Sequence, residues 1–323
     1  MKKFIKFGVL FLLIISLTSC ANNENGEEVK YINIPTASTT GALYPFGNSI
    51  ANLWNDKVDG IRANAQASNG GIDNLNLLAQ GEADISMAVS SNVYQSFEGI
   101  EKFQGRENKK VRVIAGLYYN PNQVVVSTEA NINSLEDLKG ARFAPGAPGA
   151  TTEYETSVHF KEVGLKYPDD INAQFVSFTE SIDLMRNKQI DGAWIMAGAP
   201  TSAVTEMLKT TNTKILEIPK EVVDNLRKDY PWYSNYTLKA GTYEELTEDI
   251  NTSAIKMVMF CSEDLDEELV YNLTKVFFEN LEDLKKTHSF LSEVTLESAV
   301  EEIAGLEIHP GAERYYKEMG IIQ

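Results

Sequence analysis

A unit that occurs twice along the chain limits the fold more than any other feature: a short apolar strand, a turn of small residues, and a helix. The first strand covers residues 31–34, and the turn at residues 39–49 reads TTGALYPFGNS. Phe46, Ile50, Leu53 and Trp54 follow at the spacing of one helix face. Alternation of strands and helices is typical of α/β proteins, so we expect a mixed, mostly parallel sheet flanked by helices.

The second unit indicates that a second lobe is inserted into the first. Its strand covers residues 141–144, its turn covers residues 145–153, and its helix extends to Val163. The chain is expected to leave the first lobe near residues 124–127 and to return near residues 256–260. We therefore predict two α/β lobes, with lobe I formed by residues 30–124 and 257–323 and lobe II by residues 125–256.

Two crossings between lobes would form a hinge, and hinged lobes enclose a cleft. Ligands of open α/β sheets bind beyond the carboxyl ends of the strands. The glycine-rich and hydroxyl-rich turns all follow predicted strands, so we expect these turns to face the cleft.

Three local predictions accompany this scheme. Residues 111–117 and 124–127 are predicted to be separate strands. Residues 90–92 (SSN) are predicted to end the preceding strand in a polar turn. Residues 265–284 carry apolar side chains at helical spacing and are predicted to form one helix.

The N-terminus is predicted to be a lipoprotein signal peptide, residues 1–19. Three lysines precede an apolar stretch at residues 7–17, which is too short to span a bilayer comfortably. The stretch ends in LTSC, which is similar to a lipobox, so we expect cleavage before Cys20 and lipidation of its thiol. The alternative is an ordinary signal with an incidental cysteine. Residues 20–29 are polar and are expected to tether the folded, extracytoplasmic part to the membrane.

Composition excludes several classes of function. The formal net charge is −17, and it becomes −20 when residues 1–19 and their three lysines are removed. Nucleic-acid binding needs basic patches, so we expect no such partner. Cys261 is the one cysteine left after lipidation of Cys20, and His159, His288 and His309 are not at metal-ligand spacing. We expect a monomer without metal, cofactor or catalytic activity.

The stretch TTGALYPFGNS lacks what two catalytic motifs require. A phosphate-binding P-loop has four residues between its glycines and then a lysine. Here five residues separate Gly41 from Gly47, and Asn48 stands in place of the lysine. A nucleophile elbow needs G-x-S-x-G, and Ala51 stands where its last glycine belongs. We therefore interpret the stretch as the first strand-to-helix turn.

Short motifs follow one another in order from Tyr31 to the C-terminus. They are TGALYPFG at 40–47, SNGG at 68–71, Leu75, Leu78, Gly81, AD at 83–84, LY at 117–118, Pro121, VVV at 124–126, LEDLKG at 135–140, GAT at 149–151, DGA at 191–193, GAP at 198–200, AGTY at 240–243, HPGA at 309–312, Tyr315, Tyr316 and Gly320. In this order and spacing the chain resembles the TAXI solute-binding proteins, which are extracytoplasmic receptors of one class of TRAP transporters.

The resemblance implies a two-lobed periplasmic-binding-protein fold of type II that closes on a ligand and delivers it to TRAP permease subunits in the membrane. Ligands of that family are mostly glutamate-like amino acids, small dicarboxylates and oxoacids. The chain departs from the family pattern at residues 90–92, 148–151 and 194–195, which bears on the identity of the solute. The same fold also serves ABC importers and membrane sensors, and a related scaffold serves some enzymes, so these stay as alternatives.

An anionic solute needs hydrogen-bond donors, and helix N-termini provide free N–H groups and a favourable dipole. Hydroxyl and amide side chains beside them would add contacts. The candidate ligand-binding residues are Thr39, Thr40, Gly41, Tyr44, Ser68, Asn69, Gly70, Ser90, Ser91, Asn92, Pro148, Gly149, Ala150, Thr151, Thr152, Gly198 and Pro200. Alternatively, the glycines only permit turns and the hydroxyls only cap helices. Arg142 either reaches the cleft or forms a surface ion pair.

Overall fold

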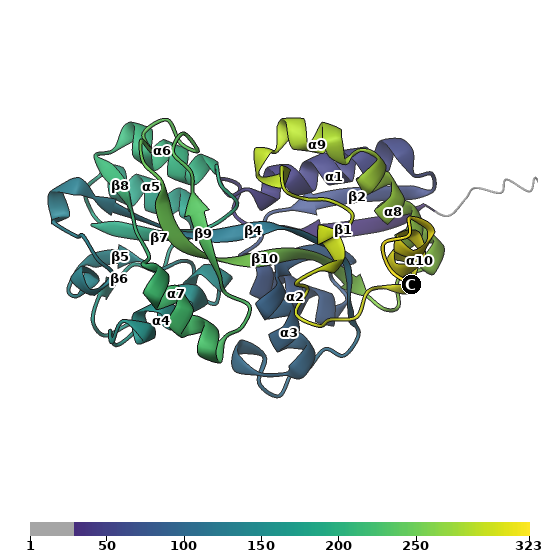
Figure 1. The fold of residues 1–323 in the computed structure, drawn as a ribbon, viewed down its shortest axis with the longest axis horizontal. Coiled ribbons are helices and arrows are strands. Elements are labelled where there is room, and N and C mark those ends of the chain that lie inside the picture. Colours follow the sequence, from purple (N-terminus) through teal and green to yellow (C-terminus); the bar gives the residue numbers. More distant parts are fainter. Residues whose placement is uncertain (1–28) are drawn as a thin grey trace, which may run out of the picture.

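The computed structural model describes residues 29–323, which fold into two α/β halves joined through the middle of the molecule (Figure 1). The predicted signal peptide, Cys20 and residues 20–28 of the predicted tether lie outside the described residues. The predicted two-lobed α/β architecture is confirmed.

Each half combines strands with helices that cover them. The half at the right of Figure 1 contains β1 (Lys30–Pro35), α1 (Leu43–Lys57), β2 (Ile61–Gln66), α2 (Gly71–Gln80), β3 (Ile85–Val89), α3 (Ser90–Glu98), α8 (Glu267–Glu279), α9 (Leu281–Thr287) and α10 (Pro310–Glu318). The half at the left contains β5 (Arg142–Ala144), α4 (Thr151–Glu162), β6 (Asn172–Ala173), α5 (Phe178–Arg186), β7 (Gly192–Met196), α6 (Ser202–Thr210), β8 (Thr213–Leu216), α7 (Lys220–Asp229) and β9 (Ser234–Leu238).

Two long strands, β4 (Val111–Ser127) and β10 (Ile250–Ser262), run through both halves and pair with each other in antiparallel fashion. Each strand changes its other neighbours along its length. β10 pairs with β9 up to Ala254 and with β3 from Met257, and β4 pairs with β7 from Asn122. The two strands are therefore common to both halves and connect them.

The sheets are mixed, as predicted, although antiparallel pairs are more frequent than expected. β1–β2, β5–β6 and β5–β7 are parallel. The pairs made by β4 and β10 with β3, β7, β8, β9 and each other are antiparallel. The difference arises because two opposed strands cross the molecule, and the strands of each half align along them.

Three local predictions were wrong. Residues 111–127 form one strand rather than two. At Pro121 this strand pairs with β10 alone, so the N–H that proline lacks is not needed by a second neighbour, as on an edge strand. Residues 90–92 begin α3 rather than a turn, which suits serine and asparagine at a helix N-terminus. The helix predicted at 265–284 is divided at Asn280 into α8 and α9.

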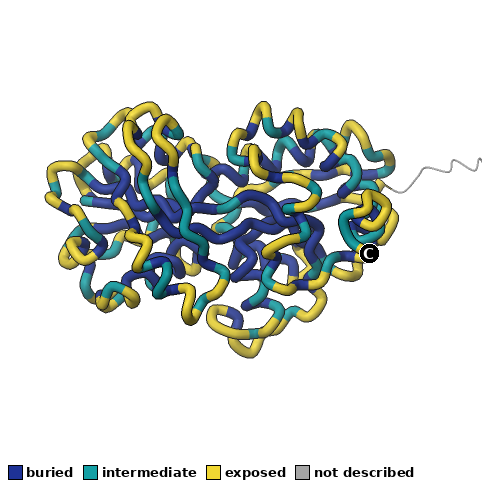
Figure 2. Tube along the Cα trace, viewed as in Figure 1, coloured by how far each residue is buried: buried dark blue, intermediate teal, exposed yellow. Residues whose placement is uncertain are grey.

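The core follows from the apolar faces of the elements, and Figure 2 shows the central strands buried beneath exposed outer helix faces. Phe46, Ile50 and Trp54 are buried on α1, which confirms the predicted helix face. The Trp54 indole also donates to the Leu273 carbonyl of α8 at 3.1 Å. Across residues 29–323, no helix combines the length and apolar character needed to cross a bilayer.

Candidate functional site

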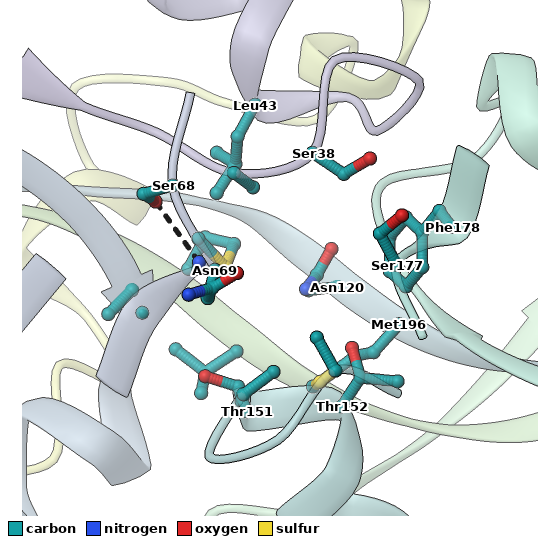
Figure 3. Close-up of a pocket in the computed structure, with 18 residues that line it drawn as sticks. Ser38, Leu43, Ser68, Asn69, Asn120, Thr151, Thr152, Ser177, Phe178 and Met196 are labelled. Carbon is teal, nitrogen blue, oxygen red and sulfur yellow. Dashed lines mark hydrogen bonds between the residues drawn. The ribbon is translucent and has the colours of Figure 1, made fainter. Parts of the chain in front are cut away.

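A cavity of about 70 Å³ lies between the two halves, and both halves contribute to its wall (Figure 3). β4 and β10 form its floor through Asn120 and Met257. The other lining residues are Ala37, Ser38, Leu43, Ser68, Asn69, Gly70, Gly71, Ala88, Val89, Ala147, Ala150, Thr151, Thr152, Ser177, Phe178 and Met196. The halves thus meet around this cavity.

Four helices present their N-termini to this cavity. Leu43 begins α1, Gly71 begins α2, Thr151 begins α4 and Phe178 begins α5, and all four residues line the wall. The first N–H groups of a helix have no partner within it, and the helix dipole places positive charge there. Their convergence makes the cavity a positive environment without any cationic side chain.

Of these four N-termini, that of α4 has the most N–H groups without a hydrogen-bond partner. No side chain caps it, and the N–H groups of Thr151, Thr152 and Glu153 donate to no acceptor among the described residues. At α5, by contrast, Ser177 and Glu180 form a capping box, in which the Glu180 N–H donates to the Ser177 hydroxyl and the Ser177 N–H donates to the Glu180 carboxylate. The α4 N-terminus is therefore the strongest candidate for a group that binds an anion.

Thr151 also connects the halves. Its Oγ1 donates to Asn92 Oδ1 of α3 at 2.8 Å and accepts from the Ile72 N–H of α2 at 3.3 Å. The backbones approach so closely that a Cβ on Gly71 would lie 2.7 Å from Ala88 Cβ and 3.2 Å from Thr151 Oγ1. A larger residue at position 71 would clash first with Ala88 of β3, because α2 packs closely onto β3 within one half, and Thr151 of the other half contacts the same place.

Asn120 is the polar side chain on the floor of the cavity. It is 7% exposed, and its Oδ1 has no hydrogen-bond partner in the described structure. In Figure 3 its amide lies between Asn69 on one side and Ser177 with Phe178 on the other. A buried amide atom without a partner costs free energy, which a bound polar group would recover.

Within the described chain, none of the residues that line the cavity is acidic or basic. The two carboxylates on the first turns of α4 are engaged elsewhere. Glu153 pairs with Lys102 at 3.4 Å, and Glu155 accepts from the Tyr233 hydroxyl at 2.8 Å. The electrostatic potential in the cavity is therefore set by the helix N-termini.

Six of the residues predicted from the sequence line the cavity. They are Ser68, Asn69, Gly70, Ala150, Thr151 and Thr152. Two turns, one from each half, thus meet across one space. Whether these residues contact a solute stays a prediction.

The other predicted residues lie outside the cavity wall. Thr39, Pro148, Gly149 and Pro200 are exposed, and Tyr44 is half-buried on α1. Ser90 and Ser91 are buried at the start of α3. Asn92 accepts a hydrogen bond from the Thr151 hydroxyl, which lines the cavity. Gly41 packs beside the Phe178 ring, and Gly198 packs against Tyr118 and Phe290.

The turn TTGALYPFGNS contacts the opposite half directly rather than lining the cavity at its centre. The Thr40 carbonyl accepts from Thr201 Oγ1 at 3.0 Å and from the Ala203 N–H at 3.1 Å. The lining residues of this segment are Ala37, Ser38 and Leu43, which flank the predicted ones. Arg142 is exposed, and its Nε donates to Asp191 at 3.1 Å, so it forms a surface ion pair away from the cavity.

Sequence reasoning missed several lining residues, and two of them carry a signal. Asn120 stands with two other amides, Asn122 and Gln123, between Leu117 and Val124. Ser177 begins the sequence Ser-Phe-Thr-Glu, which is a capping-box pattern and marks the start of α5. Ala88, Val89 and Met257 are ordinary core residues in sequence, and their place at the cavity follows from strand position alone.

A polar cluster lies entirely buried behind α4. His159 Nε2 is 2.7 Å from Ser253 Oγ of β10, and Asn122 Nδ2 of β4 donates to the same hydroxyl at 2.9 Å. Burial raises the pKa of Glu155 to about 7 and lowers the pKa of His159 to about 4. The Ser253 hydroxyl is inaccessible, so the cluster fastens α4 to the central strands. Within residues 29–323, no three His, Cys, Asp or Glu side chains gather as metal ligands would.

Solved structures with the same architecture have very different sequences. PhnD1 from Prochlorococcus marinus (MIT 9301), in complex with methylphosphonate, is 13% identical with a TM-score of 0.56, over 91% of this chain and 99% of that chain. The alkanesulfonate-binding protein SsuA from Xanthomonas axonopodis pv. citri, bound to MOPS, is 14% identical with a TM-score of 0.51. The match covers 90% of this chain and 84% of that chain. A putative L-cystine ABC transporter from Listeria monocytogenes is 16% identical with a TM-score of 0.50, over 82% and 97%.

At such identities the likeness concerns the fold, which is that of the two-lobed periplasmic binding proteins. The sequence itself identifies the family. Residues 34–320, nearly the whole described part, match the NMT1-like family. This chain therefore belongs to the NMT1-like family.

Proposed function

We propose that the protein is an extracytoplasmic solute-binding receptor that closes its two lobes on a small anionic solute and delivers it to a TRAP membrane permease. One observation carries the proposal: four helix N-termini surround a cavity between the lobes, and no acidic side chain lines it. The candidate solutes are those of the resembled family, namely glutamate-like amino acids, dicarboxylates and oxoacids. The lipid anchor predicted at Cys20 would hold the receptor near its permease.

The geometry supports an anion for a physical reason. A carboxylate at a helix N-terminus accepts hydrogen bonds from free N–H groups and interacts favourably with the helix dipole. The N–H groups of Thr151 and Thr152 provide such donors on α4. The solutes named for two structural neighbours, methylphosphonate and MOPS, also carry anionic groups, which is consistent with this choice.

An ABC importer is the second candidate partner, because one structural neighbour is described as an ABC transporter protein. The fold is the same in both cases, so the site does not distinguish the two. The genes beside this one do: a large permease gene without an ATPase gene supports the TRAP assignment, and an ATPase gene supports the ABC assignment.

A thermal-shift screen tests the proposed function. Binding to the folded state alone adds about 2.7 kcal/mol of stability at a ligand concentration of a hundred times Kd. We expect at least one small carboxylate or oxyanion to raise the unfolding temperature by roughly 5 °C or more. A rise with small cations, or no rise with any anion at 10 mM-scale concentrations, roughly a hundredfold above a weak Kd, would contradict the proposal.

A further inference from the structure

We infer that the cavity selects small carboxylates that carry an oxo or hydroxyl oxygen beside the carboxylate, excludes amino acids, and binds that oxygen through Asn120. This inference rests on the proposed function and narrows its solute class. Two features of the described residues support it: the absence of acidic side chains from the wall, and the unpaired amide on the floor of the cavity.

An ammonium group would find no carboxylate partner among the residues that line this cavity. An amino acid carries one, and burying a cation without a paired carboxylate costs far more than burying a neutral group. The nearby carboxylates of α4 are engaged, since Glu153 pairs with Lys102 and Glu155 accepts from Tyr233. The positive ends of the four helices would also repel an ammonium group.

Asn120 provides the second contact that an oxo or hydroxy acid needs. With the carboxylate at the α4 N-terminus, the neighbouring oxygen would lie over the floor, where the Asn120 amide has an unpaired Oδ1. An amide donates through its nitrogen and accepts through its oxygen, so it serves either an oxo or a hydroxyl group. Its oxygen would also accept from an ammonium, so the discrimination against amino acids comes from the missing carboxylate on the wall and from the helix N-termini rather than from Asn120.

The decisive experiment compares pyruvate, L-lactate and L-alanine by calorimetry on the mature chain. The three probes share a carboxylate and a three-carbon skeleton, and they differ only in the oxo, hydroxyl or ammonium group at the second carbon. We expect pyruvate or lactate to bind with a Kd at least a hundredfold lower than that of alanine. Alanine binding within tenfold of the better acid, or no binding of any of the three, would overturn the inference.

The anion screen separates failure of the inference from failure of the proposed function. If larger anions raise the unfolding temperature and the three-carbon acids do not bind, the inference fails and the receptor function stands. If no anion has any effect, both fail.

The role of Asn120 is tested by Asn120→Ala, which is expected to weaken binding of the preferred acid about ten- to hundredfold, as for a buried polar oxygen left without its hydrogen-bond partner. Asn235→Ala is the matched control, because Asn235 also has a buried Oδ1 without a partner but lies on β9 outside the cavity. The control should leave affinity unchanged. Equal affinities of Asn120→Ala and the unmodified protein would remove Asn120 from the site.

Discussion

Replacing Thr151 by valine is expected to weaken solute binding roughly ten- to hundredfold while leaving the unfolding temperature of the unliganded protein nearly unchanged. Valine has the shape of threonine and lacks the hydroxyl that joins Asn92 Oδ1 and the Ile72 N–H across the closed interface. Each buried polar group left without a partner costs about 1–3 kcal/mol. In an open form both groups would be hydrated, so the cost falls on closure and appears as lost affinity.

Calorimetry on the variant, with the best solute from the thermal-shift screen, measures this effect. Thr179→Val is the matched control, because Thr179 Oγ1 is 3.3 Å from Thr40 Oγ1 across the same interface but is exposed. When the exposed Thr179 hydroxyl is removed, water takes its place as the partner of Thr40 Oγ1. We therefore expect the affinity of Thr179→Val for the solute to change by less than about threefold. If Thr151→Val binds as tightly as the unmodified protein, the closed interface does not contribute to solute binding.

Replacing Glu155 by glutamine is expected to change the pH dependence of folding stability. Burial raises the pKa of Glu155 from 4.5 to about 7. Hydrogen bonds from Tyr233 and Asn122 lower this pKa, but burial has the larger effect. The folded protein therefore binds more protons than the unfolded chain between about pH 4.5 and 7, so Glu155 makes stability fall as pH rises through this window. Glutamine resembles the protonated form of Glu155 at every pH. Glu155→Gln therefore removes the loss of about 3 kcal/mol in the free energy of unfolding that Glu155 causes as pH rises through this window.

His159 acts in the opposite direction. Burial lowers its pKa from 6.5 to about 4, so the unfolded chain binds more protons between these values and stability rises with pH there. Urea unfolding at pH 5 and pH 8 should show Glu155→Gln gaining stability relative to the unmodified protein as pH rises, and His159→Gln losing it. Parallel pH profiles for all three proteins would show that neither group is held as the structure indicates.

The architecture was predictable because it depends on patterns that repeat along the chain. The alternation of strands, small-residue turns and helices predicted two α/β lobes, and the turns at residues 68–70 and 150–152 lie at the cavity. Helix starts can be read from local sequence because capping residues and glycines act locally. The same reasoning placed Thr39, Thr40, Gly41 and Tyr44 at the site, and the structure puts Ala37, Ser38 and Leu43 there instead.

The misplacements have a common physical origin. Which side of a turn faces a cavity depends on how two halves pack, and no local pattern encodes that packing. Asn120 shows this most clearly: its position on the floor depends on β4 running unbroken past Pro121, where the sequence predicted a break between two strands. Met257 and Ala88 reach the wall only because β10 pairs with β3 and β4.

The position of the cavity floor has a mechanical consequence. Asn120 and Met257 belong to the strands that join the halves, and the polar cluster of Asn122, Ser253 and His159 fastens α4 to the same strands. A solute on this floor would lie beside the two strands about which the halves would have to rotate. For such a rotation, displacement grows with distance from the strands, so a sub-ångström adjustment around the solute would become a far larger movement at the outer helices.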